Sequence, residues 1–440
     1  MFVEPLDIPM MYGRIAIASV ALTHALCATF IVGSTMIGAA SETIGYVRQD
    51  LRFERLARLI AFTLIFTTAA ISFFGVTFVF LLNIFWPRFW STLFRIMFWP
   101  LILEACFFLG EAIFAYAWYY SWDWSKSSVR RMRWHLSFGW GAAICAFIAM
   151  VMIDIVASYM LTPLPPDQIW QAIFNPTMLY LDQHRIVGNL TWTGFGLAAI
   201  CAIAFLRSKT ATDRLFYRWG GAVCFTVGFG AMLIMPAIGY RYLLEVRYTE
   251  PQAFHTVMLG PRSWLFDLVA LLYGAMAVLG SLYIFRTIRS HASQGNAALL
   301  ILPVSLAVLM IAGIVFAMPY HLQHVPFLSR LTDAAINPLG KMQPNKYFAI
   351  SALVFFGLLN WILLLRSFGG RSSWWRTSIT REPDRVNPTL LIVVAGCAMV
   401  TMLSMGWVRE TARAYNGYLI YGQMSFSDER STYEGFRPSR

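Results

Sequence analysis

The sequence has little charge. Only 13% of its 440 residues are Asp, Glu, Lys or Arg, whereas 58% are hydrophobic, and the mean hydropathy is +0.60. The apolar residues form long, numerous runs, unlike the scattered core positions of a soluble domain. This pattern argues against a soluble enzyme. We predict an all-α fold, a polytopic membrane helix bundle.

Cysteine is scarce as well, with six residues that all fall in apolar runs. None forms C-x-x-C or C-x-x-C-H, so we expect no disulfide, no iron–sulfur site and no covalently attached heme c. The chain also lacks a Walker loop, a G-x-G-x-x-G fingerprint after a strand, and a supported Ser–His–Asp pattern. ATP, dinucleotide and serine-hydrolase sites are therefore not indicated.

Ten apolar runs predict ten transmembrane helices. They cover residues 12–41, 57–84, 94–120, 135–161, 186–206, 216–241, 264–286, 297–318, 347–366 and 388–407. The net charge of +12 gathers in the loops that follow the first, third, fifth and ninth of these runs. Those loops share one side, which the positive-inside rule makes cytoplasmic. Both termini should then face the periplasmic, outer side, and the basic balance indicates topology and no nucleic-acid partner.

Two glutamates lie inside the third run, FRIMFWPLILEACFFLGEAIFAYAWYY. Glu104 and Glu111 are seven residues apart, which is two helical turns, so both carboxyls occupy one helix face. An ionisable side chain at membrane depth costs a few kcal/mol, at least about 2.5 on insertion scales, and is by default a functional hypothesis. We expect the pair to handle protons. The alternative is a structural, packed pair.

Other polar residues gather toward the predicted outer side. His24 lies within the first run and His184 at the start of the fifth, while His321 and His324 follow the eighth and Glu410 the tenth. A cofactor layer would explain this bias, although each histidine has the alternative of a packed or interfacial side chain. We expect Asp154 and Asp267 to pair with arginines such as Arg262.

At these residues the chain resembles subunit I of cytochrome bd-type quinol oxidases. His24, followed by SETIGYV with Glu42, is similar to the family's first helix, and PLILEACFFLGEAIFAYAWYYSWDW to its third. SYMLTP resembles the family's exit from the fourth helix, and NPTMLYLDQHRIVGNLTWTGF the entry to its fifth. The resemblance covers residues 10–240 in order and spacing, so we divide the chain into a heme-binding bundle over 1–240, a divergent half over 241–407 and a polar outer tail over 408–440.

The second half departs from that family. The quinol-binding loop, which is long in the family, corresponds here to residues 242–263. The seventh helix of this chain has Asp267 and Val269 where the family has a heme-ligating methionine. The family's G-R-Q-P-W motif is absent. Glu410 in GWVRETARAYNGYLIYG and His321, with His324 nearby, compete for the position of the family's glutamate heme ligand.

The resemblance implies a respiratory subunit of the bacterial inner membrane. His24 would ligate a high-spin heme, with Glu104 near its open face and Glu111 on a proton path, and His184 would ligate a low-spin heme b. We expect one to three hemes, heme b with heme d as an alternative, together with quinone or quinol and a second membrane subunit. Two functions remain open, namely quinol oxidation with oxygen as acceptor, or electron transfer between quinone and a periplasmic cytochrome c or other redox partner.

Overall fold

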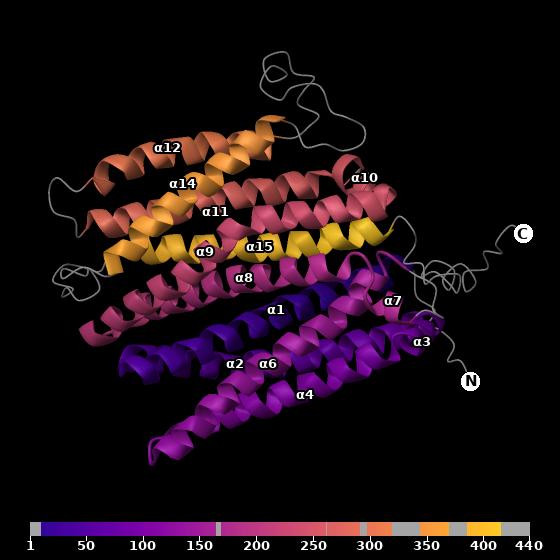
Figure 1. Ribbon diagram of the computed structural model, residues 1–440, viewed down its shortest axis with the longest axis horizontal. Coiled ribbons are helices and arrows are strands. Elements are labelled where there is room, and N and C mark those ends of the chain that lie inside the picture. The colour runs from indigo at the N-terminus through magenta and orange to yellow at the C-terminus, as the bar shows by residue number, and fades with distance from the viewer. Residues whose placement is uncertain are drawn as a thin grey trace, which may run out of the picture. The chain divides into compact units, whose positions relative to one another are not determined.

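The computed structural model describes residues 10–163, 169–260, 262–290, 297–318, 344–368 and 385–414. All regular structure in these segments is helical. Ten helices are long and apolar enough to cross a membrane, which confirms the predicted fold class. They are α1 (Met10–Arg48), α2 (Leu51–Phe85), α4 (Phe98–Tyr120), α6 (Val129–Tyr159), α8 (Met178–Arg207), α9 (Ala211–Thr249), α11 (Trp264–Arg289), α12 (Ala298–Ala317), α14 (Pro344–Phe368) and α15 (Val386–Ala414) (Figure 1).

Within the described segments, four shorter helices connect these spans: α3 (Pro87–Ile96), α5 (Trp122–Ser125), α7 (Ile169–Ile173) and α10 (Pro251–Leu259). The third apolar run, residues 94–120, is interrupted at Met97, so it contains the end of α3 and the whole of α4. Before this run the chain bends at Trp86, and Pro87 occupies the start of α3. Proline is tolerated in the first turn of a helix but not in its interior, so it marks the start of a new helix here.

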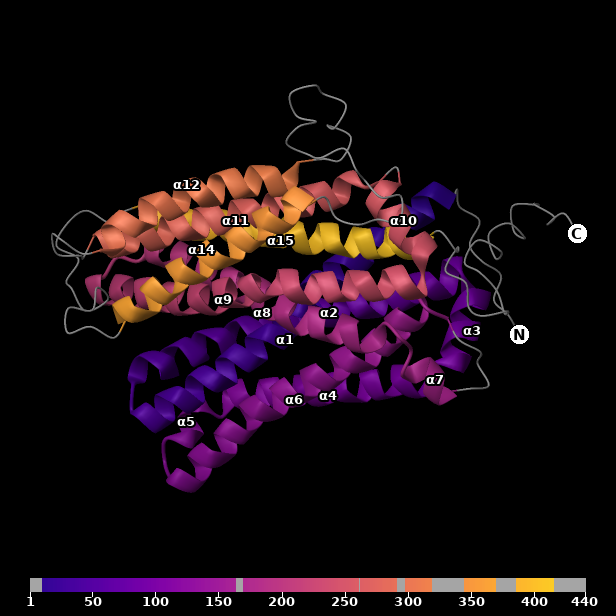
Figure 2. The ribbon, with the colours of Figure 1, turned by 45° about the horizontal axis from the view of Figure 1, so that its top comes forward.

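The chain forms two compact units. The first contains residues 1–186, 240–254 and 409–440, and the second contains residues 187–239 and 255–408. In the first unit, α1 packs along α2 and α4 packs along α6, as Figures 1 and 2 show from two directions. In the second unit, α11, α12 and α14 pack against one another. The proposed division at residues 240 and 407 stays a prediction.

Small residues allow close helix packing in each unit. A Cβ added to Gly110 of α4 would lie 3.1 Å from Cys145 Sγ on α6, and one added to Gly139 of α6 would lie 3.1 Å from Trp118 Cε2 on α4. In the second unit, a Cβ on Gly194 would come within 2.4 Å of the Gly228 nitrogen. Helices in a membrane gain packing contacts in this way, because lipid provides no hydrophobic drive for them to associate.

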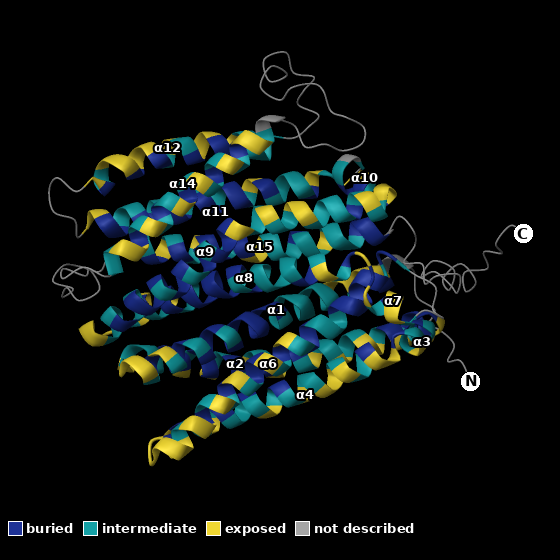
Figure 3. Ribbon diagram, viewed as in Figure 1, coloured by how far each residue is buried: buried dark blue, intermediate teal, exposed yellow. Residues whose placement is uncertain are grey.

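Helices differ sharply in how much of their surface is covered. The most apolar window of α2 or α4 is only 17% buried, whereas that of the span containing α8 is 61% buried. Figure 3 shows exposed residues along α4 and mainly buried or partly buried ones on α8. The acids of α4 therefore lie on a helix whose other faces are free to meet lipid or another subunit.

Candidate functional site

Glu104 and Glu111 lie on α4, as the sequence predicts, and in the first unit. Glu104 is half-buried, whereas Glu111 is buried with 3% of its surface exposed. The Glu111 carboxyl interacts electrostatically with Glu104, and its Oε1 atom has no hydrogen-bond partner. A buried carboxyl oxygen without a partner is rare in folded proteins and calls for a functional or solvent-based explanation.

His24 lies on α1, where its ring packs over Gly75 of α2. A Cβ at Gly75 would stand 3.0 Å from His24 Cε1, so the glycine leaves room for the imidazole. The ring atom Nδ1 is buried and has no hydrogen-bond partner within bonding geometry, while the backbone of Ile71 on α2 interacts with the ring. No contact joins His24 to Glu104 or Glu111 in the described parts of the chain, so the structure brings the histidine and the acids into one unit but not together.

His184 lies on α8, and its ring centroid is 5.8 Å from that of Tyr242 on α9. Its Nδ1 atom is also buried without a hydrogen-bond partner. We expected His184 to open the fifth span, yet α8 begins at Met178, so His184 lies within the second helical turn. A network of buried hydrogen bonds lies directly before the first residue of α8. Asn175 Nδ2 donates to Ser158 Oγ at 2.8 Å and Thr162 Oγ1 donates to Asn175 Oδ1 at 3.0 Å, which fixes the turn before the helix.

Arg185 interacts electrostatically with both histidines, His24 and His184. Its guanidinium also binds Asp154 of α6 through Nη1 and Oδ1, and Asp154 is fully buried with Asp182 beside it. The arginine partner expected for Asp154 is therefore present, although it comes from α8. In the second unit, Asp267 pairs with Lys346 at 3.7 Å and not with Arg262.

The remaining predicted residues lie elsewhere. Glu410 is half-buried near the end of α15, where its Oε1 atom lies 3.2 Å from Arg409 Nη2 and 3.6 Å from Arg413 Nη1. Arg409 and Arg413 also act electrostatically on Tyr242, which places this helix end near His184 within the first unit. His321 and His324 lie outside the described residues.

The sequence predicts no role for His135, yet the structure places it in a buried polar cluster. His135 of α6 is fully buried, and its Nε2 atom lies 2.8 Å from Glu42 Oε1 of α1. The Trp118 indole donates to the other carboxyl oxygen, Oε2, at 2.6 Å. The sequence gives only part of this arrangement: Glu42 is recognisable as a charge directly after the first apolar run, whereas its partners lie on two other helices.

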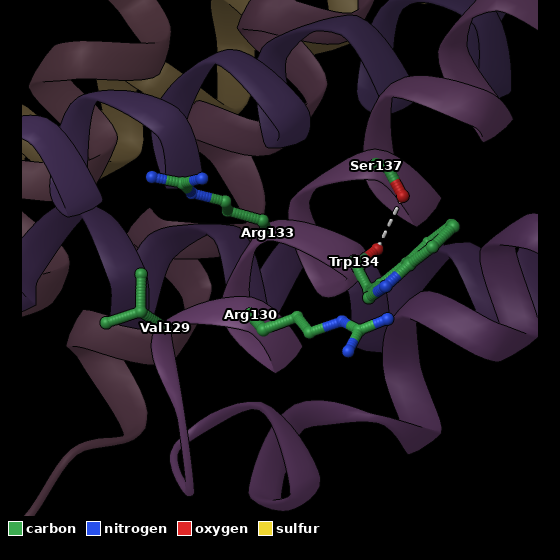
Figure 4. Close-up of a pocket in the computed structure, with 5 residues that line it drawn as sticks. All are labelled: Val129, Arg130, Arg133, Trp134 and Ser137. Carbon is green, nitrogen blue, oxygen red and sulfur yellow. Dashed lines mark hydrogen bonds between the residues drawn. The ribbon is translucent and has the colours of Figure 1, made fainter.

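A surface hollow of about 450 Å³ lies near the start of α6. It is lined by Val129, Arg130, Arg133, Trp134 and Ser137 (Figure 4). All five residues are exposed. Arginine and tryptophan are typical of the membrane–water interface, so this hollow fits a lipid headgroup layer better than a reaction site.

Comparison with known families identifies the family of this chain. The family model for cytochrome bd terminal oxidase subunit I matches residues 12–258, which is more than half of the chain. The chain belongs to this family. The predicted resemblance is thereby confirmed, and the protein is a membrane subunit of the bd type, a respiratory electron-transport family of oxidoreductases. The match includes His24, Glu104, Glu111 and His184 and ends before Glu410.

A solved structure shares the fold. It is described as the structure of bd oxidase from Geobacillus thermodenitrificans, and it aligns with a TM-score of 0.52 over 92% of this chain and 98% of that chain. The two sequences are 17% identical, so this likeness concerns the fold alone. No curated protein matches the chain in sequence.

Proposed function

We propose that this bd-family subunit carries heme b, oxidises quinol and passes the electrons to oxygen in a bacterial inner membrane. The observation that carries the proposal is the pair of half-buried histidines, His24 and His184, each with a buried ring nitrogen, Nδ1, that has no hydrogen-bond partner. Membrane interiors rarely leave such groups unpaired without a functional reason.

The donor set fits heme. Neutral imidazole is a common protein ligand of heme iron, and the two half-buried histidines supply one imidazole each. When bound, heme would supply reversible one-electron chemistry at iron and, at an open coordination position, reduction of oxygen. His24 would hold the high-spin heme and His184 the low-spin heme b. Arg185, which acts on both rings, would add a fixed positive charge between them.

The two carboxyls of α4 would handle the protons. Adding an electron to a site of low dielectric is electrostatically expensive unless a proton accompanies it. A desolvated carboxyl can hold or release a proton near neutral pH. Glu111 Oε1 has no protein partner, so it is free to bind water or a transferred proton, and Glu104 lies two turns along the same face. The two residues are about 10 Å apart along the helix, so protons would move between them through intervening water, in step with electrons.

A second membrane subunit completes this proposal. Helices α2 and α4 bury few of their apolar residues within the chain, which leaves surface for a partner as well as for lipid. Isolation of the complex in mild detergent, followed by mass spectrometry, would identify that subunit. A chain that is purified alone and still turns over quinol would contradict this part of the proposal.

A specific observation favours an alternative acceptor. Only residues 250–263 separate α9 from α11, and nine of them form the short helix α10. The bd family has a long quinol-binding loop in this place, so quinol would bind differently here. The alternative is a bd-like electron-transfer subunit that links the quinone pool to a periplasmic cytochrome c or other redox partner, without oxygen reduction.

The test has two parts. A pyridine-hemochrome spectrum of the purified complex counts and types its hemes, and oxygen uptake with a reduced quinol is compared with reduction of cytochrome c. The His24→Ala variant should insert normally yet lose the absorbance of one heme. The matched control is His255→Ala, because His255 is exposed on α10 and has no predicted role. An unchanged heme content in His24→Ala would make His24 a packing residue.

A further inference from the structure

Three helices of the first unit meet around a buried acid and a buried imidazole. Glu42 near the end of α1 is 1% exposed, and His135 near the start of α6 is 0% exposed. The third contributor is the end of α4, which supplies Trp118 and the C-cap residue Ser121. In the topology predicted from the basic loops, this meeting point lies toward the cytoplasmic side.

The acid and the imidazole must share a proton. Glu42 Oε1 and His135 Nε2 are 2.8 Å apart, although they are not aligned as an ideal hydrogen bond and neither atom has another partner. A deprotonated carboxylate oxygen and an unprotonated ring nitrogen are both acceptors and would repel each other at this distance. At least one proton therefore lies on this pair. Trp118 donates to Oε2 at 2.6 Å and leaves Glu42 as the acceptor.

Ser121 gives the imidazole a second position for a proton. Its hydroxyl lies 2.7 Å from His135 Nδ1 and 3.3 Å from the carbonyl oxygen of Trp118. When His135 is neutral, Ser121 can donate to Nδ1. When His135 is an imidazolium, Nδ1 donates to Ser121 Oγ, and the hydroxyl hydrogen can turn to the Trp118 carbonyl. Both charge states thus keep their hydrogen-bond partners, which a buried titrating group requires.

We propose that Glu42, His135 and Ser121 form a proton-binding site that takes up one proton from the side of the basic loops. In the uptake step, a hydronium ion gives a proton to Ser121 Oγ and leaves as water, while Ser121 passes its own proton to His135 Nδ1. The number of hydroxyl protons is unchanged and the imidazole gains one. The Glu42 carboxylate compensates the added charge. Proton binding stands on this geometry alone, whereas its use in turnover rests on the function proposed above.

The charged side chains nearest to His135 outside the site lie around Trp122. The Trp122 ring stands edge-on to His135, with centroids 4.8 Å apart, and its indole donates to Glu54 Oε1 of α2 at 3.4 Å. Lys126 Nζ lies 3.6 Å from the same oxygen, and Arg58 lies over the Trp122 ring at 5.9 Å. These groups of α2 and the end of α5 surround Trp122, so they act on His135 through that ring and not by direct contact.

Trp118 separates this site from the acids of α4. It follows Glu111 by seven residues on the same helix face, at a rise of about 10 Å. A Cβ on Gly38 of α1 would be 2.6 Å from Trp118 Cη2, so the indole fills the space between α1 and α6. An indole N–H donates only and cannot relay a proton. The site and Glu111 would therefore interact through charge and would not exchange protons directly through Trp118.

Solid-state ¹⁵N NMR of the whole complex in lipid tests the proposal, because imidazole ¹⁵N shifts report tautomer and charge. The dipeptide Trp134–His135 is the only Trp–His pair among the seven histidines, so labelling the Trp carbonyl carbon together with all His carbons and nitrogens assigns the His135 amide and, by correlation through its side chain, the His135 ring without a substitution. We expect its Nδ1 signal to change from the neutral to the imidazolium form as the pH is lowered. A single protonation state throughout the range in which the complex stays folded would overturn the proposal.

Two serine variants separate proton binding from packing. Ser121→Ala removes the acceptor for Nδ1–H and should increase the neutral fraction of His135 at a given pH. Ser125→Ala is the control, because Ser125 is buried one turn further on and donates only to the Trp122 carbonyl at 2.7 Å. Equal effects of the two variants would contradict the proposed role of Ser121. If His135 titrates in a complex that does not oxidise quinol, the proposed function fails while this site stands.

Discussion

Removing the charge of Arg185 should destabilise the first unit strongly. Asp154 is fully buried and its Oδ1 atom binds the Arg185 guanidinium, while its Oδ2 atom has no hydrogen-bond partner. Asp182 is 7% exposed and lies beside Asp154. The Arg185→Gln substitution would leave two adjacent buried carboxyls without their cation.

The structure also ranks the variants at this site. Loss of one partner from a buried ion pair costs about 3–5 kcal/mol, and we expect this range for Arg185→Gln. Asp154→Asn leaves Arg185 next to Asp182, so the guanidinium keeps a compensating charge. That variant should cost about 1–3 kcal/mol, the usual loss for an imperfectly replaced buried hydrogen bond. The double variant should cost less than the sum of the two single variants, because it removes both charges together.

Thermal unfolding of the purified complex in one detergent measures this order, with the heme spectrum recorded on the same samples. Arg185 is adjacent to His184 and acts electrostatically on His24, so Arg185→Gln should also disturb heme absorbance. The reasoning is refuted if Arg185→Gln is no more destabilising than Asp154→Asn. Additive single effects would show in turn that the two side chains are not coupled.

Three further predictions concern other parts of the chain. Glu111→Gln keeps the size of the side chain but removes its titratable proton, so assembly should be intact while turnover slows about a hundredfold and its pH profile changes; a lower unfolding temperature with normal turnover would make the acid structural. Gly194→Ala should lower the free energy of unfolding by about 1–3 kcal/mol, because its Cβ would lie 2.4 Å from the Gly228 nitrogen. The control Gly396→Ala should leave it unchanged, because no atom lies within 4 Å of the added Cβ. Lys346→Met should lower stability by at most about 1 kcal/mol, since its 3.7 Å pair with Asp267 is partly exposed; a loss of several kcal/mol would show that the pair is effectively buried.

The sequence by itself determined the features that depend on one segment at a time. Ten long apolar runs predict ten spans because a membrane helix satisfies its own backbone and needs only length and hydrophobicity. The common face of Glu104 and Glu111 follows from helical periodicity, and it needs no knowledge of the neighbouring helices. Family membership was readable for the same reason, since its motifs lie in order along residues 12–258.

Only the tertiary structure decided which distant groups meet. Glu42, Ser121 and His135 come from three segments, and their contact depends on an indole packed between Gly38 and Gly139. Arg185 of α8 pairs with Asp154 of α6, and the Asn175 hydrogen bonds join the segment before α8 to the end of α6. Hydropathy carries no information about helix rotation or register, and these two properties determine which buried polar side chains can form pairs.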